Sequence, residues 1–167
     1  MFLSRRRLVL IGTVIVIVGV IVLLPLIYTI TLPDLGVVSI IIKNIELKDI
    51  SDDNNTATLN VVFNIKNPTS QALTTSKIDY ELVADGKSLG EYIKSFIDIP
   101  VNGRPQLLSN TDTNISSIIE TPISDQAFRM NLVQNNHTMQ NIDWSVNGNA
   151  IIESGFSSAP KTFNATW

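Results

Sequence analysis

The sequence has no cysteine, and its 167 residues include a single histidine, His137. The absence of cysteine excludes a disulfide framework, a thiolate metal site and a cysteine nucleophile. His137 lies in an Asn-rich stretch, where a surface loop is expected. No nucleophile elbow or glycine-rich phosphate loop accompanies it. We therefore expect a protein that is not an enzyme and that binds no cofactor.

Basic residues are scarce beyond the N-terminus. From Asp34 onward the chain has nine Lys and Arg residues against fifteen Asp and Glu residues, a net charge of −6. Binding to nucleic acid needs clustered basic residues that neutralise phosphates, so this composition excludes a nucleic-acid partner. It also gives no attraction to an anionic lipid surface.

Charge is absent from a long N-terminal run, since no charged residue lies between Leu8 and Pro33. About twenty apolar residues in a helix cross a hydrocarbon core of about 30 Å. The run is longer than the apolar region of a cleaved signal peptide, about 7–15 residues, and no small-residue cleavage pattern follows it. We therefore predict residues 8–32 as an uncleaved transmembrane signal anchor, which makes the lipid bilayer a partner of this helix.

Charge asymmetry across the run predicts the topology. Arg5, Arg6 and Arg7 precede it, whereas the first charged residue beyond it is Asp34. Positively charged flanks of membrane helices stay on the cytoplasmic side. Residues 1–7 are therefore predicted to be a cytoplasmic basic stub of a single-pass cell-membrane protein, with the C-terminal domain outside.

Four N-x-S/T sequons follow the predicted anchor, at Asn54, Asn114, Asn136 and Asn164. Asn67 is excluded because Pro68 follows it. On the outer side of a membrane these four residues are candidate N-glycosylation sites.

Strand signals dominate from residue 37 onward. In Thr58–Lys66 apolar residues alternate with polar ones, which predicts a half-buried strand that Asn67-Pro68 ends. The same criteria predict strands at 37–47, 77–82, 89–97, 106–116, 139–147 and 150–153. Asp85-Gly86 and Asn147-Gly148 are predicted as turns, and a slip in the alternation near Glu91–Ile93 predicts a bulge.

One helix is expected after the polar strand at 106–116. Thr121 can cap it, Pro122 suits its first position, and Ile123, Ala127 and Met130 share a face up to about Gln134. The fold is therefore predicted as mainly β. It would be an antiparallel seven-stranded β-sandwich of immunoglobulin or fibronectin-III type with one short helix, preceded by a single transmembrane helix.

The segment with Asp49, Ser51, Asp53 and Asn55 has the alternating oxygen spacing of a calcium loop. It lacks the glycine of the sixth position and the closing glutamate, where Asn60 stands instead. A solvated turn is expected here rather than a metal site.

The order of these signals resembles the water stress and hypersensitive response (WHy) domain of late embryogenesis abundant (LEA) proteins, subgroup 2. The strand 59–66 running into Asn67-Pro68 is the most specific element. It is followed by Ile78–Leu82, by the turn Asp85-Gly86-Lys87, and by Trp144–Gly148. The likeness covers about Val37 to Phe163, and residues 37–167 are assigned to such a domain. The layout is similar to that of membrane-anchored prokaryotic members, archaeal ones in particular.

The resemblance implies a seven-stranded antiparallel sandwich with one helix, no catalytic residues, and a structural role for Asn67 and Pro68. It also implies a membrane-anchored extracytoplasmic module that binds or protects client proteins or lipids under desiccation or osmotic stress. Two alternatives stay open. One is a pilin-like or surface-layer structural subunit with the apolar helix as its stem, and the other is a lipid-binding domain.

Overall fold

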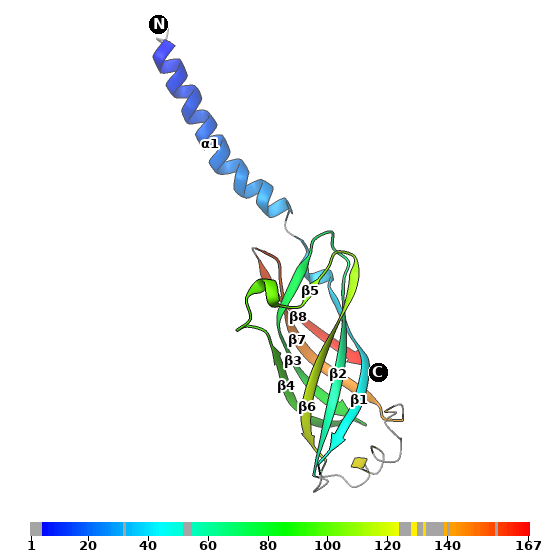
Figure 1. Cartoon of the computed structure of the whole chain (residues 1–167). Helices are drawn as coiled ribbons and strands as arrows, with labels where there is room; N and C mark the ends of the chain where they lie inside the picture. Colours follow the sequence, from blue (N-terminus) through cyan, green and yellow to red (C-terminus); the bar gives the residue numbers. More distant parts are fainter. Residues whose placement is uncertain are drawn as a thin grey trace. The chain divides into compact units, whose positions relative to one another are not determined.

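The computed structural model describes residues 5–31, 33–51, 55–123, 128–129, 132, 139, 141–155 and 157–167 (Figure 1). The chain divides into two compact units, Met1–Pro33 and Asp34–Trp167. The first unit holds helix α1 (Arg5–Thr31), and the second holds eight described strands. The mainly β, antiparallel fold class is therefore confirmed, with eight strands in place of the predicted seven.

Helix α1 is apolar on all sides. Its window Arg5–Pro25 has a mean hydropathy of 3.1, and none of that window is buried inside the protein. Leu, Ile and Val side chains on every face give a helix that no part of its own unit covers. Among the described residues, α1 is the one helix long and apolar enough to cross a membrane.

A three-stranded sheet forms one layer of the second unit. The strands are β1 (Ser39–Ile50), β2 (Thr56–Asn67) and β6 (Thr111–Pro122), in the order β1-β2-β6. A 3₁₀ turn, η1 (Leu35–Val37), precedes β1. The strict alternation in β2 sends Leu59, Val61, Phe63 and Ile65 inward, as predicted.

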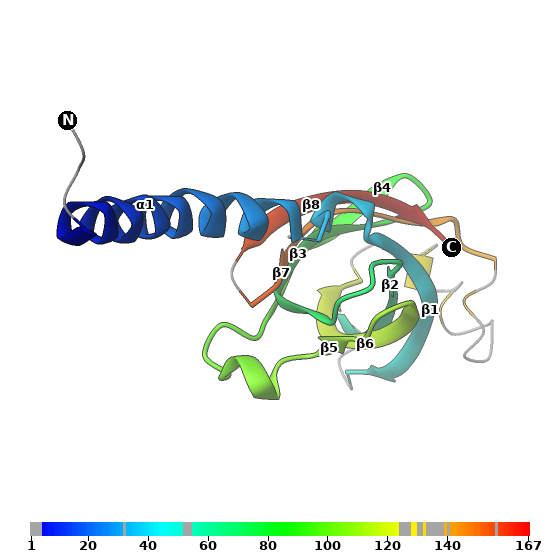
Figure 2. The same cartoon turned by 90° about the horizontal axis from the view of Figure 1, so that it is seen from above.

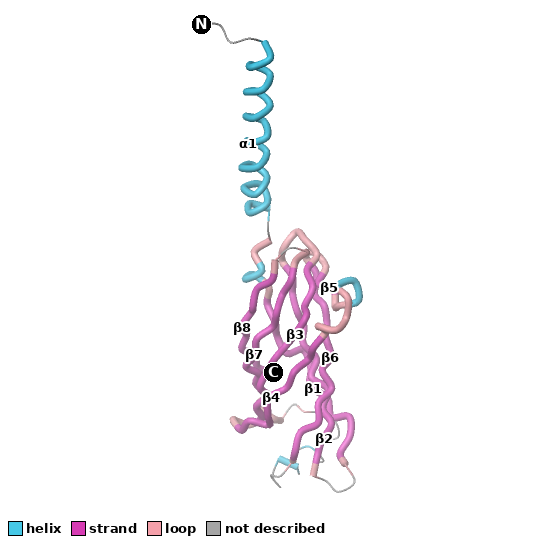
Figure 3. Tube along the Cα trace, turned by 90° about the vertical axis from the view of Figure 1, so that its left-hand side faces the viewer, coloured by secondary structure: helices cyan, strands magenta, loops and turns pink. Residues whose placement is uncertain are grey.

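The second layer has five strands. Its main path is β4 (Lys87–Ser95), β3 (Leu73–Ala84), β7 (Trp144–Glu153) and β8 (Ser158–Thr166). The short β5 (Gln106–Leu107) pairs with the start of β3. Between β4 and β5 lies a second 3₁₀ turn, η2 (Val101–Gly103). Figure 3 shows the long strands of both layers running side by side.

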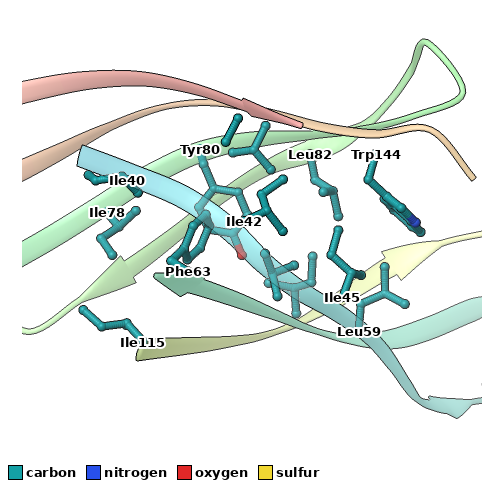
Figure 4. Close-up of a cluster of buried hydrophobic side chains, with 14 of the residues drawn as sticks. Ile40, Ile42, Ile45, Leu59, Phe63, Ile78, Tyr80, Leu82, Ile115 and Trp144 are labelled. Atoms are coloured by element: carbon teal, nitrogen blue, oxygen red, sulfur yellow. The ribbon is translucent and has the colours of Figure 1, made fainter. Parts of the chain in front are cut away.

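Aromatic rings fill the space between the two sheets. The Phe63 ring of β2 meets the Tyr80 ring of β3 edge-on at 4.9 Å between centroids, and the Phe163 ring of β8 at 5.9 Å. The Tyr80 hydroxyl donates a buried 2.8 Å hydrogen bond to Ser117 Oγ of β6. Figure 4 shows Phe63 and Tyr80 among Ile42, Leu59 and Leu82. The sheets are thus joined by apolar packing and by this buried hydrogen bond.

The predicted hairpin turn at Asp85-Gly86 is confirmed. Both residues have positive φ, 49° and 75°, which matches a two-residue turn between β3 and β4. The bulge lies slightly earlier than predicted. The register shifts between Leu82 and Val83, opposite Gly90 and Ser88, and Gly90 has φ 132°. A glycine accommodates this backbone, so Leu89 is the extra residue rather than one in 91–93.

The predicted turn at Asn147-Gly148 is wrong. Both residues lie inside β7, where Gly148 pairs with Tyr80 and Phe163. A Cβ atom on Gly148 would lie 2.6 Å from Phe163 Cζ and 2.7 Å from the Asp79 backbone oxygen. Glycine serves close packing here rather than chain reversal, so the strands predicted at 139–147 and 150–153 merge into one.

The predicted cap of the second helix is also wrong. Thr121 and Pro122 continue β6, where they pair with Ala57 and Thr56, and the Thr121 hydroxyl donates to the Leu89 carbonyl oxygen of β4. Of the remaining predicted helix, Phe128, Arg129 and Leu132 have helical backbone. Ala127, Met130 and Gln134 lie outside the described residues.

Two further differences complete the strand count. The polar strand predicted at 106–116 is divided into β5 and β6, because Asn110 turns the chain with φ 54°. Strand β8 was not predicted, since Pro160 and its polar neighbours hide the pattern. Among the described strands β8 pairs with β7 alone, and an edge strand tolerates proline because one side of it needs no N–H donor.

Candidate functional site: the Asn67 junction and the outer faces

Asn67 ends β2 and is fully buried, at 0% exposure. Its Nδ2 donates to the carbonyl oxygens of Gln71 and Leu107, both at 2.8 Å, and more weakly to that of Leu108 at 3.3 Å. Its Oδ1 accepts from the Thr69 backbone N–H at 3.0 Å and from the Thr69 hydroxyl at 2.8 Å. The amide therefore joins the end of β2 to β5 of the opposite sheet.

Pro68 is exposed and has no N–H to donate. The ladder between β2 and β6 ends immediately before it, at Asn67 opposite Thr111. The chain then turns through 68–72, held by Asn67 and Thr69, before β3 begins at Leu73. Every donor and acceptor of the Asn67 side-chain amide is hydrogen-bonded inside the protein. Asn67 and Pro68 therefore form a structural junction between β2 and the following turn.

Two of the four sequons lie in the described strands. Asn114 in β6 and Asn164 in β8 are both exposed, one on each sheet. Each belongs to a cross-strand amide pair: Asn64 Nδ2 donates to Asn114 Oδ1 at 3.0 Å, and Asn164 Nδ2 donates to Asn147 Oδ1 at 2.7 Å. Asn54 and Asn136 lie outside the described residues.

The predicted topology residues Arg5, Arg6 and Arg7 form the exposed first turn of α1. At the weak calcium-loop pattern, Asp49 Oδ1 accepts from the Ile50 N–H, and Ser51 Oγ accepts from the Thr56 N–H. Asp53 lies outside the described residues. Within the part of the chain that is described, no group of three or more His, Asp or Glu side chains could hold a metal ion.

A hollow of about 550 Å³ lies on the five-stranded sheet. Its lining comes from three neighbouring strands and includes, beside the exposed Ile93, the polar side chains Lys77, Asp79, Glu81, Glu91, Asn147 and Asn149. Lys77 Nζ pairs with Asp79 Oδ2 at 2.7 Å, and Glu81 lies directly opposite Glu91. This hollow was not predicted, since it depends on which strands become neighbours. The polar half of each alternation was its only trace in the sequence.

Inside the sheet beneath this hollow, Tyr80 is nearly fully buried at 3% exposure. Burial raises the pKa of its hydroxyl to about 12, while the hydrogen bond with Ser117 Oγ acts in the opposite direction. The neutral phenol is therefore retained over a wide pH range. Its place between the sheets makes it part of the core rather than a group available to a ligand.

No family model matches this chain, and no curated protein matches it. Several solved structures are similar in fold. A crystal structure of a protein from Archaeoglobus fulgidus shares 11% identity with a TM-score of 0.45, covering 77% of this chain and 92% of that one. A solution structure from Arabidopsis thaliana shares 13% identity with a TM-score of 0.47, covering 77% and 79%.

A third similar structure is the solution structure of a protein described as late embryogenesis abundant. It shares 13% identity with a TM-score of 0.37, covering 100% of this chain and 92% of that one. At these identities and TM-scores the likenesses carry no argument about what this chain binds or does.

Proposed function

We propose that this chain is a membrane-anchored, extracytoplasmic and non-catalytic module of LEA-like type, which binds or shields client proteins or lipids under desiccation or osmotic stress. One observation supports the proposal most. The chain contains both a helix that is apolar on all sides, α1, and a β unit that packs separately from it. That unit has its own core and polar outer faces.

The outer faces supply the physical basis for shielding. From Asp34 onward the net charge is −6, and both sheets carry rows of Asn and Glu side chains outward, including Asn64, Asn114, Asn147 and Asn164. Such surfaces stay hydrated and repel other acidic surfaces. A tethered layer of these units would keep neighbouring proteins apart as water is withdrawn.

The lipid-binding alternative requires an apolar groove between the sheets. In that space the Phe63 ring makes T-shaped contacts with Tyr80 and with Phe163, and the hollow lies on the outer face of the sheet instead. The packing therefore favours a module that acts through its surface.

An aggregation assay tests the proposal. The fragment Asp34–Trp167, which contains the complete core, is mixed with a heat- or drying-sensitive enzyme, and an unrelated domain of equal negative charge serves as control. Preservation of enzyme activity near a one-to-one ratio by the fragment, but not by the control, is the expected result. Equal preservation of enzyme activity by the fragment and by the control would mean that any acidic domain has this effect, and it would contradict a specific protective role.

The filament alternative makes a separate demand on the N-terminus. A pilin-type subunit loses its leader before the apolar helix, whereas an anchor keeps it. Mass spectrometry of the mature chain is expected to detect Arg5, Arg6 and Arg7 in place. Their removal would favour the filament.

A further inference from the structure

The start of the β unit and four of the segments that connect its strands lie at one end of the sandwich. Strands β1, β3, β6 and β8 begin there, and β2, β4 and β7 end there, as the pairs Ser39–Lys66, Asn67–Thr111, Lys77–Ser95 and Glu153–Ser158 require. We call it the Asp34 end, since the chain enters the unit there through η1. The described residues of the connections at this end are 68–72, 96–105, 108–110, 154–155 and 157.

Exposed aliphatic side chains are concentrated at the Asp34 end. The described part of the β unit exposes eight large ones, and five lie in η1 and the connections of this end: Val37, Ile97, Ile99, Val101 and Leu108. Ile41 and Ile93 lie two residues inside β1 and β4, counted from this end. Of the eight, Ile118 alone lies in mid-strand. Scattered exposed aliphatics are ordinary on a soluble surface, but this uneven distribution points to a partner at one end.

The connection 96–105 is held in a fixed form that turns its aliphatics outward. Arg104 Nε donates to the Ile99 carbonyl oxygen at 2.9 Å, one Arg104 NH₂ group donates to the Ile97 carbonyl oxygen at 3.2 Å, and the other pairs with Glu153 Oε2 at 2.5 Å. The backbone oxygens are thus satisfied from within. Ile97 and Val101 remain 53% and 52% exposed. Seen from above in Figure 2, this connection stands out from the sandwich.

Chain connectivity keeps the Asp34 end near the end of α1. The helix ends at Thr31, and Leu35 is already buried in the β unit. The four Cα–Cα steps from Thr31 to Leu35 span at most about 14 Å even when fully extended. If α1 crosses a membrane, the Asp34 end therefore lies close to that membrane's surface.

We infer that the exposed aliphatics of the Asp34 end, with Ile97, Ile99 and Val101 at their centre, dock into the interfacial region of the lipid bilayer. This rests on the proposed membrane anchor and adds a second contact with the bilayer. Buried apolar area supplies the attraction. Headgroup charge does not, because Asp98 is the one acidic residue of 96–105 and its one basic residue, Arg104, is paired with Glu153. Docking is therefore expected to be insensitive to salt.

The cysteine-free sequence allows a direct test with the full chain in lipid nanodiscs. Ile97→Cys carries an environment-sensitive fluorophore at the proposed contact. The matched control is Ile118→Cys, which replaces an isoleucine that is 67% exposed on β6, away from the Asp34 end. Nanodiscs of neutral phosphatidylcholine are compared with nanodiscs whose acyl chains are brominated, since bromine quenches only a fluorophore that enters the bilayer.

The expected result is blue-shifted emission and at least twofold quenching by brominated lipid at position 97, with neither effect at position 118, in both 50 mM and 500 mM salt. Absence of quenching at both positions would overturn the inference, as would equal quenching at both. An emission shift at position 97 that needs two chains per disc, without quenching, would assign the surface to a second copy and also overturn it. Incorporation of the chain into nanodiscs is scored separately, so failure of the anchor is distinguishable from failure of docking.

Discussion

The Asn67 Nδ2 group donates a 2.8 Å hydrogen bond to the Leu107 carbonyl oxygen, forty residues further along the chain and in the other sheet. Asn67 and Leu107 are both fully buried, so neither polar group has water as a substitute partner. This contact gives the Asn-Pro motif a physical role: the asparagine joins the sheets at the Asp34 end, and the proline ends the ladder.

Replacing Asn67 by alanine should therefore cost about 3 kcal/mol of unfolding free energy, because several buried backbone groups lose their partner. Urea denaturation of the Asp34–Trp167 fragment measures this. Pro68→Ala is the matched control, since Pro68 is exposed, and it should cost less than about 1 kcal/mol. Similar losses for both variants would contradict the junction role.

Gly148→Ala should destabilise the fragment by about 2–3 kcal/mol. The new methyl group meets the Asp79 backbone oxygen, which cannot move without breaking the sheet, and the Phe163 ring. At Gly155 a new methyl group would meet no atom within 4 Å beyond its chain neighbours, so Gly155→Ala should leave stability almost unchanged. Equal melting temperatures of Gly148→Ala and Gly155→Ala would contradict this prediction, because they would show that β7 shifts to make room for the methyl group.

The raised pKa of Tyr80 should make the stability of the folded chain depend on pH in the alkaline range. Burial raises its pKa from 10.0 to about 12. Below pH 10 the phenol is neutral in both states, so its contribution is fully present. Between pH 10 and about 12 the unfolded chain loses the proton while the folded chain keeps it, and stability falls by on the order of 2 kcal/mol.

Tyr80→Phe isolates this effect from the titration of other groups. The variant should lose about 1 kcal/mol at neutral pH, because Ser117 Oγ loses its buried partner, and should show a shallower decline between pH 10 and 12. Denaturant midpoints at a series of pH values provide the comparison. Parallel curves for the two proteins would mean that Tyr80 does not control the alkaline limit.

Arg104→Lys should loosen the connection 96–105 while leaving the core intact. Lysine keeps the charge beside Glu153 but cannot also reach the Ile97 and Ile99 carbonyl oxygens as a planar guanidinium does. Hydrogen exchange at the Ile99 amide, which donates to the Phe96 carbonyl oxygen, should become faster at least tenfold. The amide of Phe63 in β2 serves as the internal reference. An unchanged exchange rate at Ile99 would show that Arg104 does not hold the connection 96–105 in place.

The sequence predicted the parts of the fold in which local pattern and tertiary environment agree. Period-two alternation located β2 and the inward face of β3, and Asp85-Gly86 located the hairpin, because that turn needs positive φ at both residues. Tyr80 of β3 and Trp144 of β7 are both buried.

The errors arose where long-range packing decides. From local sequence Gly148 suggests a turn, but its role is to make room for the Phe163 ring. Thr121-Pro122 suggests the start of a helix, but pairing with β2 keeps both residues in a strand. The hollow on the five-stranded sheet and the clustering of exposed aliphatics at the Asp34 end depend on which strands are neighbours. No local pattern contains that information.

The central claim, a β unit held outside a membrane by α1, is tested most directly by cysteine labelling in intact cells. Single-cysteine variants Ile118→Cys and Ser4→Cys of the full chain are exposed to a membrane-impermeant maleimide before and after lysis. The account predicts labelling of Ile118→Cys in intact cells and of Ser4→Cys only after lysis. Labelling of Ile118→Cys only after lysis, or recovery of the chain in the soluble fraction, would contradict it.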